Sequence, residues 1–253
     1  FDGRMFREID QVTTGWTEAI WNDGDNFFVS APGTGLWVFE IDADGNFIQR
    51  SADQTSLVEA RRLWGDGTFL YVPTGPNGLL AYRYDGMSLV SVGAPLPSQG
   101  WAQGVWTDGT TVFFADKSAF FALRFDGMRF VTIDQDTSVQ DASRVWGLGG
   151  LTYVGTADGI STYRLAGDQL RRVSDVTTGS TVREVWSDGV HVFAAAQTYG
   201  VVAYRRTGEA LIELDREDTD GTSLGVVGDG TFIYVGDGMG GIRAYSGFAC
   251  RTF

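Results

Sequence analysis

Residues 105–127 read VWTDGTTVFFADKSAFFALRFDG, and this stretch contains the pattern that decides the fold. Short runs rich in Val, Phe and Trp are separated by polar residues, and an Asp-Gly pair stands at 108–109 and again at 126–127. Asp tolerates left-handed backbone angles and Gly adopts them without a Cβ penalty, so the pair is typical of tight hairpins between strands. The stretch therefore predicts short antiparallel β-strands.

The same pattern recurs along the whole chain. One landmark is a Trp shortly before an Asp-Gly turn, and a second landmark follows at the same interval. The first stands at Trp21, Trp64, Trp106, Trp146, Trp186 and Val227, with spacings of 43, 42, 40, 40 and 41 residues, and the second at Phe39, Tyr82, Leu123, Tyr163, Tyr204 and Tyr245. A period near 41 admits helical solenoids or propeller blades. No stretch shows ten residues of helical periodicity, so four strands per unit are predicted.

The count of strands predicts how the ring closes. Fourth strands are expected at 47–51, 89–93, 130–134, 170–174 and 211–215, which leaves the sixth unit one strand short. Phe1-Asp2-Gly3 followed by residues 5–10 matches Phe125-Asp126-Gly127 followed by 128–134. We expect the N-terminal strand, residues 4–10, to complete the last blade. The tail 247–253 is the alternative strand for that place.

With its Trp-x-Asp-Gly turns and its Gly-Leu-x-Ala-Tyr-Arg strand at 78–83, the chain resembles the six-bladed β-propeller superfamily, in the manner of the NHL and LVIVD repeat propellers. The resemblance implies an all-β domain over 1–253, with four antiparallel strands per blade. It also implies a central channel and loop-bearing faces, but no particular activity, because propellers host enzymes and scaffolds alike. The expected blades are 11–51, 52–93, 94–134, 135–174, 175–215 and 216–246.

Composition limits the classes of partner. Asp and Glu number 32 against 19 Lys and Arg, a net charge of −13, which argues against nucleic acid because phosphate neutralisation needs clustered basic residues. No apolar run approaches the roughly 20 residues of a membrane span. The lone Cys250 excludes an internal disulfide framework. Part of the acidity is structural, since many of the Asp residues belong to Asp-Gly hairpins.

The first strands carry a candidate site. Two positions before the first landmark stand Ala19, Arg62, Gly104, Arg144, Glu184 and Gly225, and one position further back stand Glu18, Arg61, Gln103, Ser143, Arg183 and Leu224. Propeller geometry gathers such positions near the axis, although neighbouring strand residues point to opposite sides. Arg61, Arg62, Arg144 and Arg183, beside Glu184, could form an anion-binding mouth. Trp16 and Trp101 on adjoining loops could stack on a sugar or another ring. The alternative is a belt of ion pairs between blades.

Other chemistry-bearing residues give weaker signals. His191 lies in a second strand with no partner near it in sequence, which favours a structural role. Asp215, Asp218 and Asp220 supply the oxygen ligands that Ca²⁺ prefers but lack the spacing of an EF-hand loop, so a solvated acidic loop is favoured. No other cofactor is indicated.

The sequence favours a non-catalytic binding or assembly module over an enzyme. We expect a rigid scaffold for a protein or glycan partner or a small anion, displayed outside the cell or on the surface of a large particle. The alternative is a hydrolase or lyase that acts on an anionic sugar or lactone at the Arg-lined mouth. A structural subunit of a repeating assembly is a third reading.

Overall fold

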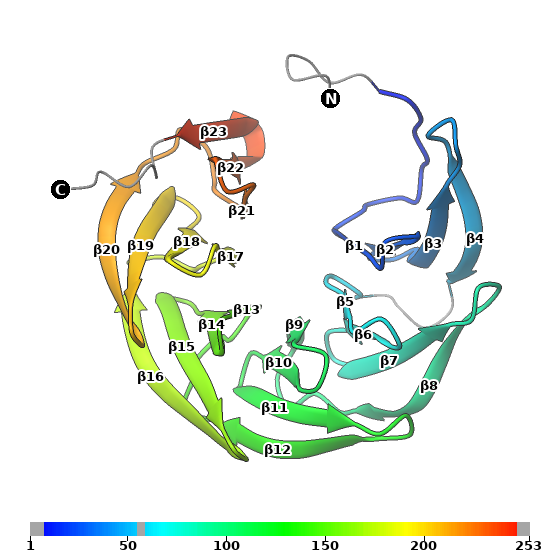
Figure 1. The fold of residues 1–253 in the computed structure, drawn as a ribbon, viewed down its shortest axis with the longest axis horizontal. Helices are drawn as coiled ribbons and strands as arrows, with labels where there is room; N and C mark the ends of the chain where they lie inside the picture. Colours follow the sequence, from blue (N-terminus) through cyan, green and yellow to red (C-terminus); the bar gives the residue numbers. More distant parts are fainter. Residues whose placement is uncertain (1–7, 55–58, 247–253) are drawn as a thin grey trace.

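A computed structural model describes residues 8–54 and 59–246, and its strands form six antiparallel sheets in chain order around a central axis (Figure 1). The first sheet contains β1 Ala19–Asn22, β2 Asn26–Ala31, β3 Gly35–Ile41 and β4 Phe47–Asp53. The second contains β5 Trp64–Gly65, β6 Leu70–Pro73, β7 Leu79–Tyr84 and β8 Leu89–Leu96, and the third β9 Ala102–Thr107, β10 Val112–Asp116, β11 Ala119–Phe125 and β12 Phe130–Asp136. The fourth sheet contains β13 Arg144–Leu148, β14 Leu151–Gly155, β15 Gly159–Ala166 and β16 Gln169–Thr177. The fifth contains β17 Glu184–Ser187, β18 His191–Ala195, β19 Val201–Thr207 and β20 Ala210–Glu217. The sixth contains β21 Gly225–Gly228, β22 Phe232–Gly236 and β23 Ile242–Ser246.

The six-bladed, all-β expectation is confirmed. Each of the first five blades has four strands, and the sixth has three within the described residues. The predicted closing strand 4–10 falls mainly on residues outside the described part, as does the tail 247–253, and residues 8–10 belong to no strand. The fourth strands extend two or three residues beyond their predicted ends, to Asp53, Leu96, Asp136, Thr177 and Glu217.

The Asp-Gly hairpins form as the sequence predicts, by hydrogen bonding of the side chain to the backbone. Asp66 Oδ1 accepts the backbone N–H groups of Thr68 (2.8 Å) and Phe69 (2.7 Å), and Gly67 has a φ of 89°. The same arrangement recurs at the turns opened by Asp23, Asp85, Asp108, Asp126, Asp188 and Asp229. These carboxylates therefore serve the fold.

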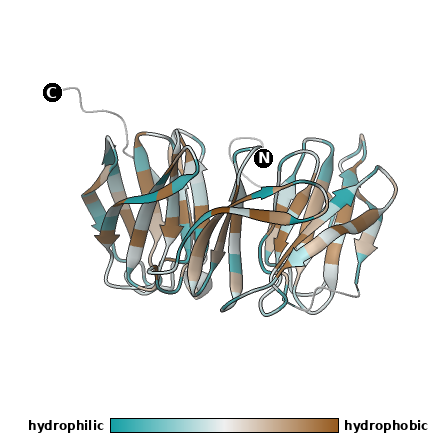
Figure 2. Cartoon of the chain, turned by 90° about the horizontal axis from the view of Figure 1, so that it is seen from below, coloured by the Kyte–Doolittle hydropathy of each residue, from teal (hydrophilic) through white to brown (hydrophobic). Residues whose placement is uncertain are grey.

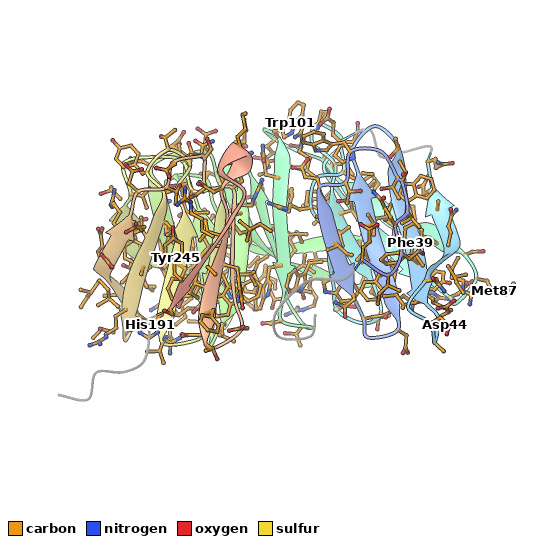
Figure 3. All side chains as sticks on the ribbon, turned by 90° about the horizontal axis from the view of Figure 1, so that it is seen from above. Phe39, Asp44, Met87, Trp101, His191 and Tyr245 are labelled. Carbon is orange, nitrogen blue, oxygen red and sulfur yellow. The ribbon has the colours of Figure 1, made fainter. Side chains whose placement is uncertain are left out.

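The core lies between blades. Five buried apolar clusters among the described residues each join two consecutive blades, for example Phe28, Leu36 and Val38 of the first blade with Leu70 and Tyr82 of the second. Seen edge-on, the strands carry the hydrophobic residues and the turns are more hydrophilic (Figure 2). Trp101 lies at one face of the disc and His191 and Asp44 at the other (Figure 3), so the linker loops and the Asp-Gly hairpins occupy opposite faces.

Candidate functional site

The repeat position two residues before the first landmark faces the axis in every blade. The six residues there all line one central cavity of about 590 Å³: Ala19, Arg62, Gly104, Arg144, Glu184 and Gly225. One repeat position supplies the whole row because each blade enters the ring in the same orientation. The sequence therefore identified this row of channel residues, whose charged members are Arg62, Arg144 and Glu184.

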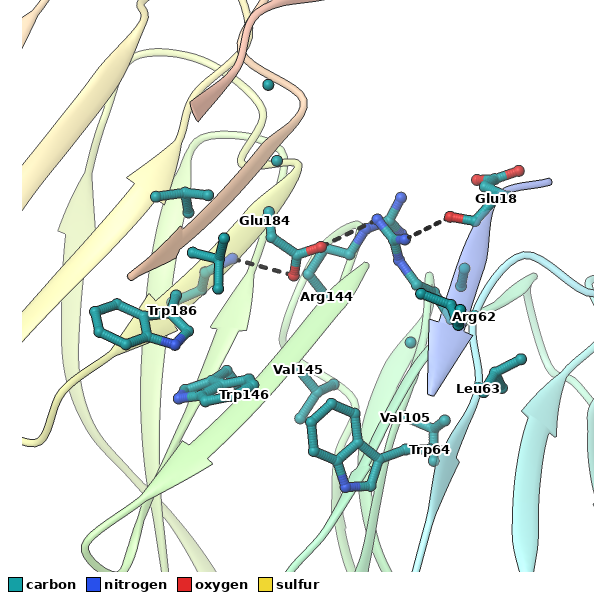
Figure 4. A pocket seen from close by; sticks show the side chains of 18 of the residues that line it. Glu18, Arg62, Leu63, Trp64, Val105, Arg144, Val145, Trp146, Glu184 and Trp186 are labelled. Atoms are coloured by element: carbon teal, nitrogen blue, oxygen red, sulfur yellow. Dashed lines mark hydrogen bonds and ion pairs between the residues drawn. The ribbon is translucent and has the colours of Figure 1, made fainter. Parts of the chain in front are cut away.

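Arg62 and Glu184 point toward one another across this cavity (Figure 4), from the second and fifth blades. The Arg62 Nη2 atom lies 3.1 Å from Glu184 Oε2, and its Nη1 donates to the Glu18 backbone carbonyl at 3.3 Å. Both side chains of the pair are about one quarter exposed, 23% and 27%. The pair thus bridges blades that are not neighbours in the chain, and part of the Arg cluster does form interblade ion pairs.

Arg144 is the most buried of the four Arg residues, with 4% exposure. Its Nε donates to the Arg183 carbonyl at 2.8 Å, and its Nη1 donates to the Ser143 carbonyl at 3.2 Å and to Gln103 Oε1 at 3.4 Å. Burial, followed by repulsion from the Arg62 guanidinium, lowers the pKa of Arg144 to about 9, which leaves it protonated at neutral pH. The hydrogen-bond acceptors of this cation are neutral, and the carboxylates of Glu184 and Glu18 offset only part of the cost of its burial.

Arg61 and Arg183 lie at the mouth of the channel and do not line the central cavity. Arg61 pairs with Glu59 at 3.1 Å and with Glu18 at 3.4 Å. The Arg183 guanidinium makes no hydrogen bond or ion pair within 8–54 and 59–246, although its backbone is hydrogen-bonded. Both Arg side chains line a second cavity, of about 640 Å³, at the mouth of the channel, together with Arg62, Arg144, Glu184, Glu18 and Trp16.

Of the two candidate Trp residues, one lies at the mouth of the channel and the other does not. Trp16 lies at the rim of the mouth with 76% exposure. Trp101 lines neither cavity; its ring lies against Gly75, and its backbone N–H donates to Asp116 Oδ1 at 2.8 Å. The site at the mouth therefore contains Trp16 and the four Arg residues with Glu184, without Trp101.

Two buried carboxylates were not singled out from the sequence. Asp116 Oδ2 accepts the Ser98 hydroxyl and the Gln99 backbone N–H, both at 2.8 Å, and so anchors the linker that enters the third blade. Asp237 accepts hydrogen bonds from Thr219 Oγ1 at 2.5 Å and from Arg243 Nε at 2.9 Å. Asp116 and Asp237 both stand ten residues after the first landmark of their blade. This shared repeat position is the sequence signal from which the two carboxylates could have been found.

The remaining candidates have structural contacts. His191 Nδ1 lies 3.1 Å from Asp188 Oδ2, three residues earlier in the same hairpin, so the expectation that His191 has no partner near it in sequence was wrong. Asp220 pairs with Arg243 at 2.9 Å, and Asp215 Oδ1 accepts the Arg216 backbone N–H. In the part of the chain that the structure describes, no group of three or more His, Cys, Asp or Glu residues is placed to hold a metal ion. Nor is any helix in that part long and apolar enough to cross a membrane.

Comparison with solved structures places the fold among β-propellers. A chain of the mitotic checkpoint complex superposes with a TM-score of 0.78 at 11% identity over 93% of this chain and 79% of that one. A predicted 6-phosphogluconolactonase of Bacteroides fragilis gives 0.75 at 12% identity over 92% and 80%, and the Cps50 (Swd1) β-propeller domain of Myceliophteria thermophila gives 0.73 at 11% over 91% and 82%. No protein-family profile and no curated protein matches the sequence. The chain is thus a β-propeller, and identities this low support the fold alone.

Proposed function

We propose that this propeller is a non-catalytic binding module, displayed outside the cell or on a particle surface, that captures a carboxylate-bearing partner at the mouth of its channel. The supporting observation is the Arg183 guanidinium, which has no counter-ion in the described part of the chain and lies in the mouth cavity beside the buried Arg144. A guanidinium binds a carboxylate through two parallel hydrogen bonds. An acidic protein side chain or an acidic sugar offers that group.

The balance of charge at the mouth supports an anionic ligand. Arg61, Arg62, Arg144 and Arg183 contribute four positive charges, while Glu18, Glu59 and Glu184 contribute three negative ones, each already paired with Arg61 or Arg62. The unpaired cation is therefore on the Arg144 and Arg183 side. Trp16 on the rim offers an exposed ring that could stack on the ligand beside its carboxylate.

A second candidate function is a hydrolase or lyase acting on an anionic sugar or lactone at the same mouth. The observation in its favour is that the Glu184 carboxylate projects into the cavity, where a bound substrate would contact it. Against it, Arg62 already engages that carboxylate at 3.1 Å, and such an engagement holds Glu184 in a structural pairing.

Titration calorimetry with citrate, D-glucuronate and a poly-glutamate peptide tests the binding function. Losing one charge-assisted contact worth about 1.5–3 kcal/mol should weaken binding roughly 10- to 100-fold in Arg183→Gln. Arg171→Gln, on an exposed strand of the fourth blade, is the matched control and should bind as the wild type does. Equal affinity of Arg183→Gln and the wild type for all three probes would refute the proposal.

The enzyme alternative is tested on the same variants. Hydrolysis of aldonolactones, followed by acid release at constant pH, should proceed at the uncatalysed rate with the wild-type protein. Turnover that is lost in Glu184→Gln but kept in Glu209→Gln would instead establish the enzyme, because Glu209 lies in the turn between β19 and β20, where it pairs with Arg164 of β15.

A further inference from the structure

The outer side of the sixth blade exposes apolar side chains that are covered in every other blade. Ile242 on β23 is 79% exposed, whereas the residues three positions before the second landmark in the other blades are at most 8% exposed: Leu36, Leu79, Phe120, Ile160 and Val201. Each of these five equivalents lies in the apolar cluster shared with the following blade. Val227 and Phe232 of the same sheet are exposed as well, at 53% and 41%.

The first blade exposes the complementary position. Ile20 on β1 is 58% exposed. The residues directly before the first landmark in the other blades are Leu63, Val105, Val145, Val185 and Val226, with exposures between 1% and 8%. Those five lie in the clusters shared with the preceding blade. Among the described residues, therefore, no blade covers this face of blade one, just as no blade covers the opposite face of blade six.

Both apolar faces border one opening in the ring. Figure 1 shows β21–β23 and β1–β4 standing apart on that side, while every other pair of consecutive blades lies side by side. Within 8–54 and 59–246, the five buried clusters account for the five interfaces between consecutive blades, and none joins the sixth blade to the first. The exposed face of blade six is the one that a blade turns to its successor, and the exposed face of blade one is the one that a blade turns to its predecessor. A further blade carries both kinds of face and would therefore fit between them.

Asp10 shows which part of such a sheet is already present. Its Oδ2 accepts the backbone N–H of Phe47, the first residue of β4, at 2.8 Å. The same bond runs at 2.7 Å from the N–H of Leu170 in the fourth blade to Asp134 Oδ2 on the fourth strand of the third blade. Asp10 thus occupies the place of a fourth-strand residue of a preceding blade and lies beside blade one, and among the described residues it belongs to no strand of the sixth sheet.

We propose that this opening is the docking site of one further blade of the same repeat type, supplied from outside residues 1–253, so that the six blades of this chain and the docked blade together form a ring of seven. Its first three strands would lie between β23 and the segment that contains Asp10, covering Ile242 and Val227 on one side and Ile20 on the other.

Distances between hairpin tips test the proposal without altering the interfaces. Asp25 and Thr231 occupy the same exposed repeat position in blades one and six; Thr68 and Thr110 occupy it in the adjacent blades two and three, and Val190 in blade five. Spin labels on paired Cys substitutions, in a chain carrying Cys250→Ser, give the three distances. The 25–231 distance should equal the 110–190 distance, which spans one intervening blade. A 25–231 distance equal to the 68–110 distance would show that six blades close on themselves, and would overturn the proposal.

Addition of the missing blade provides a second, independent test. Ser246 occupies the same repeat position as Arg205. An extended variant therefore consists of residues 1–246 followed by a second copy of residues 206–246, which supplies the fourth strand of blade six and then the first three strands of one more blade. This variant should bind a hydrophobic dye about twofold less than the natural chain, because the exposed apolar patch is covered. The matched control carries Ser in the copied positions of Val226, Ile233 and Val235 and should retain the dye binding.

Self-association is the remaining outcome to separate. If the natural chain dimerises, and the extended variant dimerises with the same affinity, the apolar faces are not the surface that the added blade covers, and the proposal fails. Loss of dimerisation in the extended variant but not in its Ser-substituted control would support it.

Discussion

At the scale of single residues, the second-landmark tyrosines occupy equivalent positions yet have different hydrogen bonding. The Tyr82 hydroxyl donates to Asp53 Oδ2 at 2.8 Å and the Tyr163 hydroxyl to Asp136 Oδ2 at 3.0 Å, in each case reaching the fourth strand of the preceding blade. The Tyr204 hydroxyl is buried and has no hydrogen-bond partner among the described residues. Burial raises the pKa of Tyr204 to about 12. Its repeat position fixes where the ring lies, but the preceding blade decides whether the hydroxyl is satisfied.

This difference predicts different effects of the same Tyr→Phe substitution at the two positions. Tyr82→Phe removes the donor from Asp53 and should lower the unfolding free energy by about 1–3 kcal/mol. Tyr204→Phe removes a hydroxyl that has no partner and should change it by less than about 0.5 kcal/mol, or raise it. Urea denaturation of the two variants beside the wild type checks this. Equal losses would mean that the Asp53 bond contributes nothing to stability.

At the scale of elements, the first strands are held together by an aromatic ring laid on the next strand. The Trp106 ring lies so close to Gly147 that a Cβ there would meet its atoms at 2.2–2.5 Å. The same relation holds between Trp21 and Gly65 and between Trp186 and Gly228. Three Trp residues therefore cover Gly residues of the following blade, and the close approach explains why glycine stands directly after the landmark at these positions.

Gly147→Ala should accordingly destabilise the protein by about 1–3 kcal/mol, because the added methyl group overpacks the interface with Trp106. Gly225→Ala is the matched control, since Gly225 also lies in a first strand and no atom stands within 4 Å of its added Cβ. Thermal unfolding followed by near-ultraviolet circular dichroism should show a lower midpoint for the first variant only. Identical midpoints would argue that the ring moves aside freely.

At the scale of the whole molecule, the turn and linker carboxylates make stability depend on acid. Backbone hydrogen bonds from Ser88 and Met87 lower the pKa of Asp85, and similar bonds lower those of Asp126 and Asp229. Burial works to raise the pKa of Asp116, but the hydrogen bonds from Ser98 and the linker backbone outweigh it and lower the pKa. A carboxyl with a lowered pKa stabilises the fold above its unfolded value, and this stabilisation disappears as the pH falls through the folded pKa.

The unfolding free energy should therefore remain high at neutral pH and fall steeply as the pH drops below about 4. In that range the carboxyl groups of the unfolded chain bind protons before those of the folded chain do. Asp116→Asn should be destabilised at pH 7, and its difference from the wild type should narrow as the pH falls below about 4 toward the folded pKa of Asp116, because protonation removes the stabilisation of the wild type that Asn lacks. The control is Asp25→Asn, on an exposed hairpin, which should track the wild type at both pH values. A constant difference for Asp116→Asn would contradict an ionised Asp116.

The sequence predicted much of the molecule because the fold is a local pattern repeated in register. Asp-Gly turns and apolar runs specify each strand within about ten residues, so the blades and the row at Arg62, Arg144 and Glu184 could be named in advance. The ends of the fourth strands could not, because Asp53 and Asp136 become strand residues only by pairing with third strands. Which Arg pairs with which Glu could not be read either, since Arg62 and Glu184 are brought together across the ring.

Taken alone, the sequence determined the class of fold, the number of repeats in the chain and the residues that face the axis, all of which follow from periodicity. Only the tertiary structure decided that Arg183 has no counter-ion among the described residues, that Trp16 and not Trp101 reaches the mouth, and that Ile20 and Ile242 are exposed. Each of those facts depends on the position of one blade relative to another. The hairpin pattern inside a blade does not encode that position, which depends on how side chains of neighbouring sheets fill the space between them.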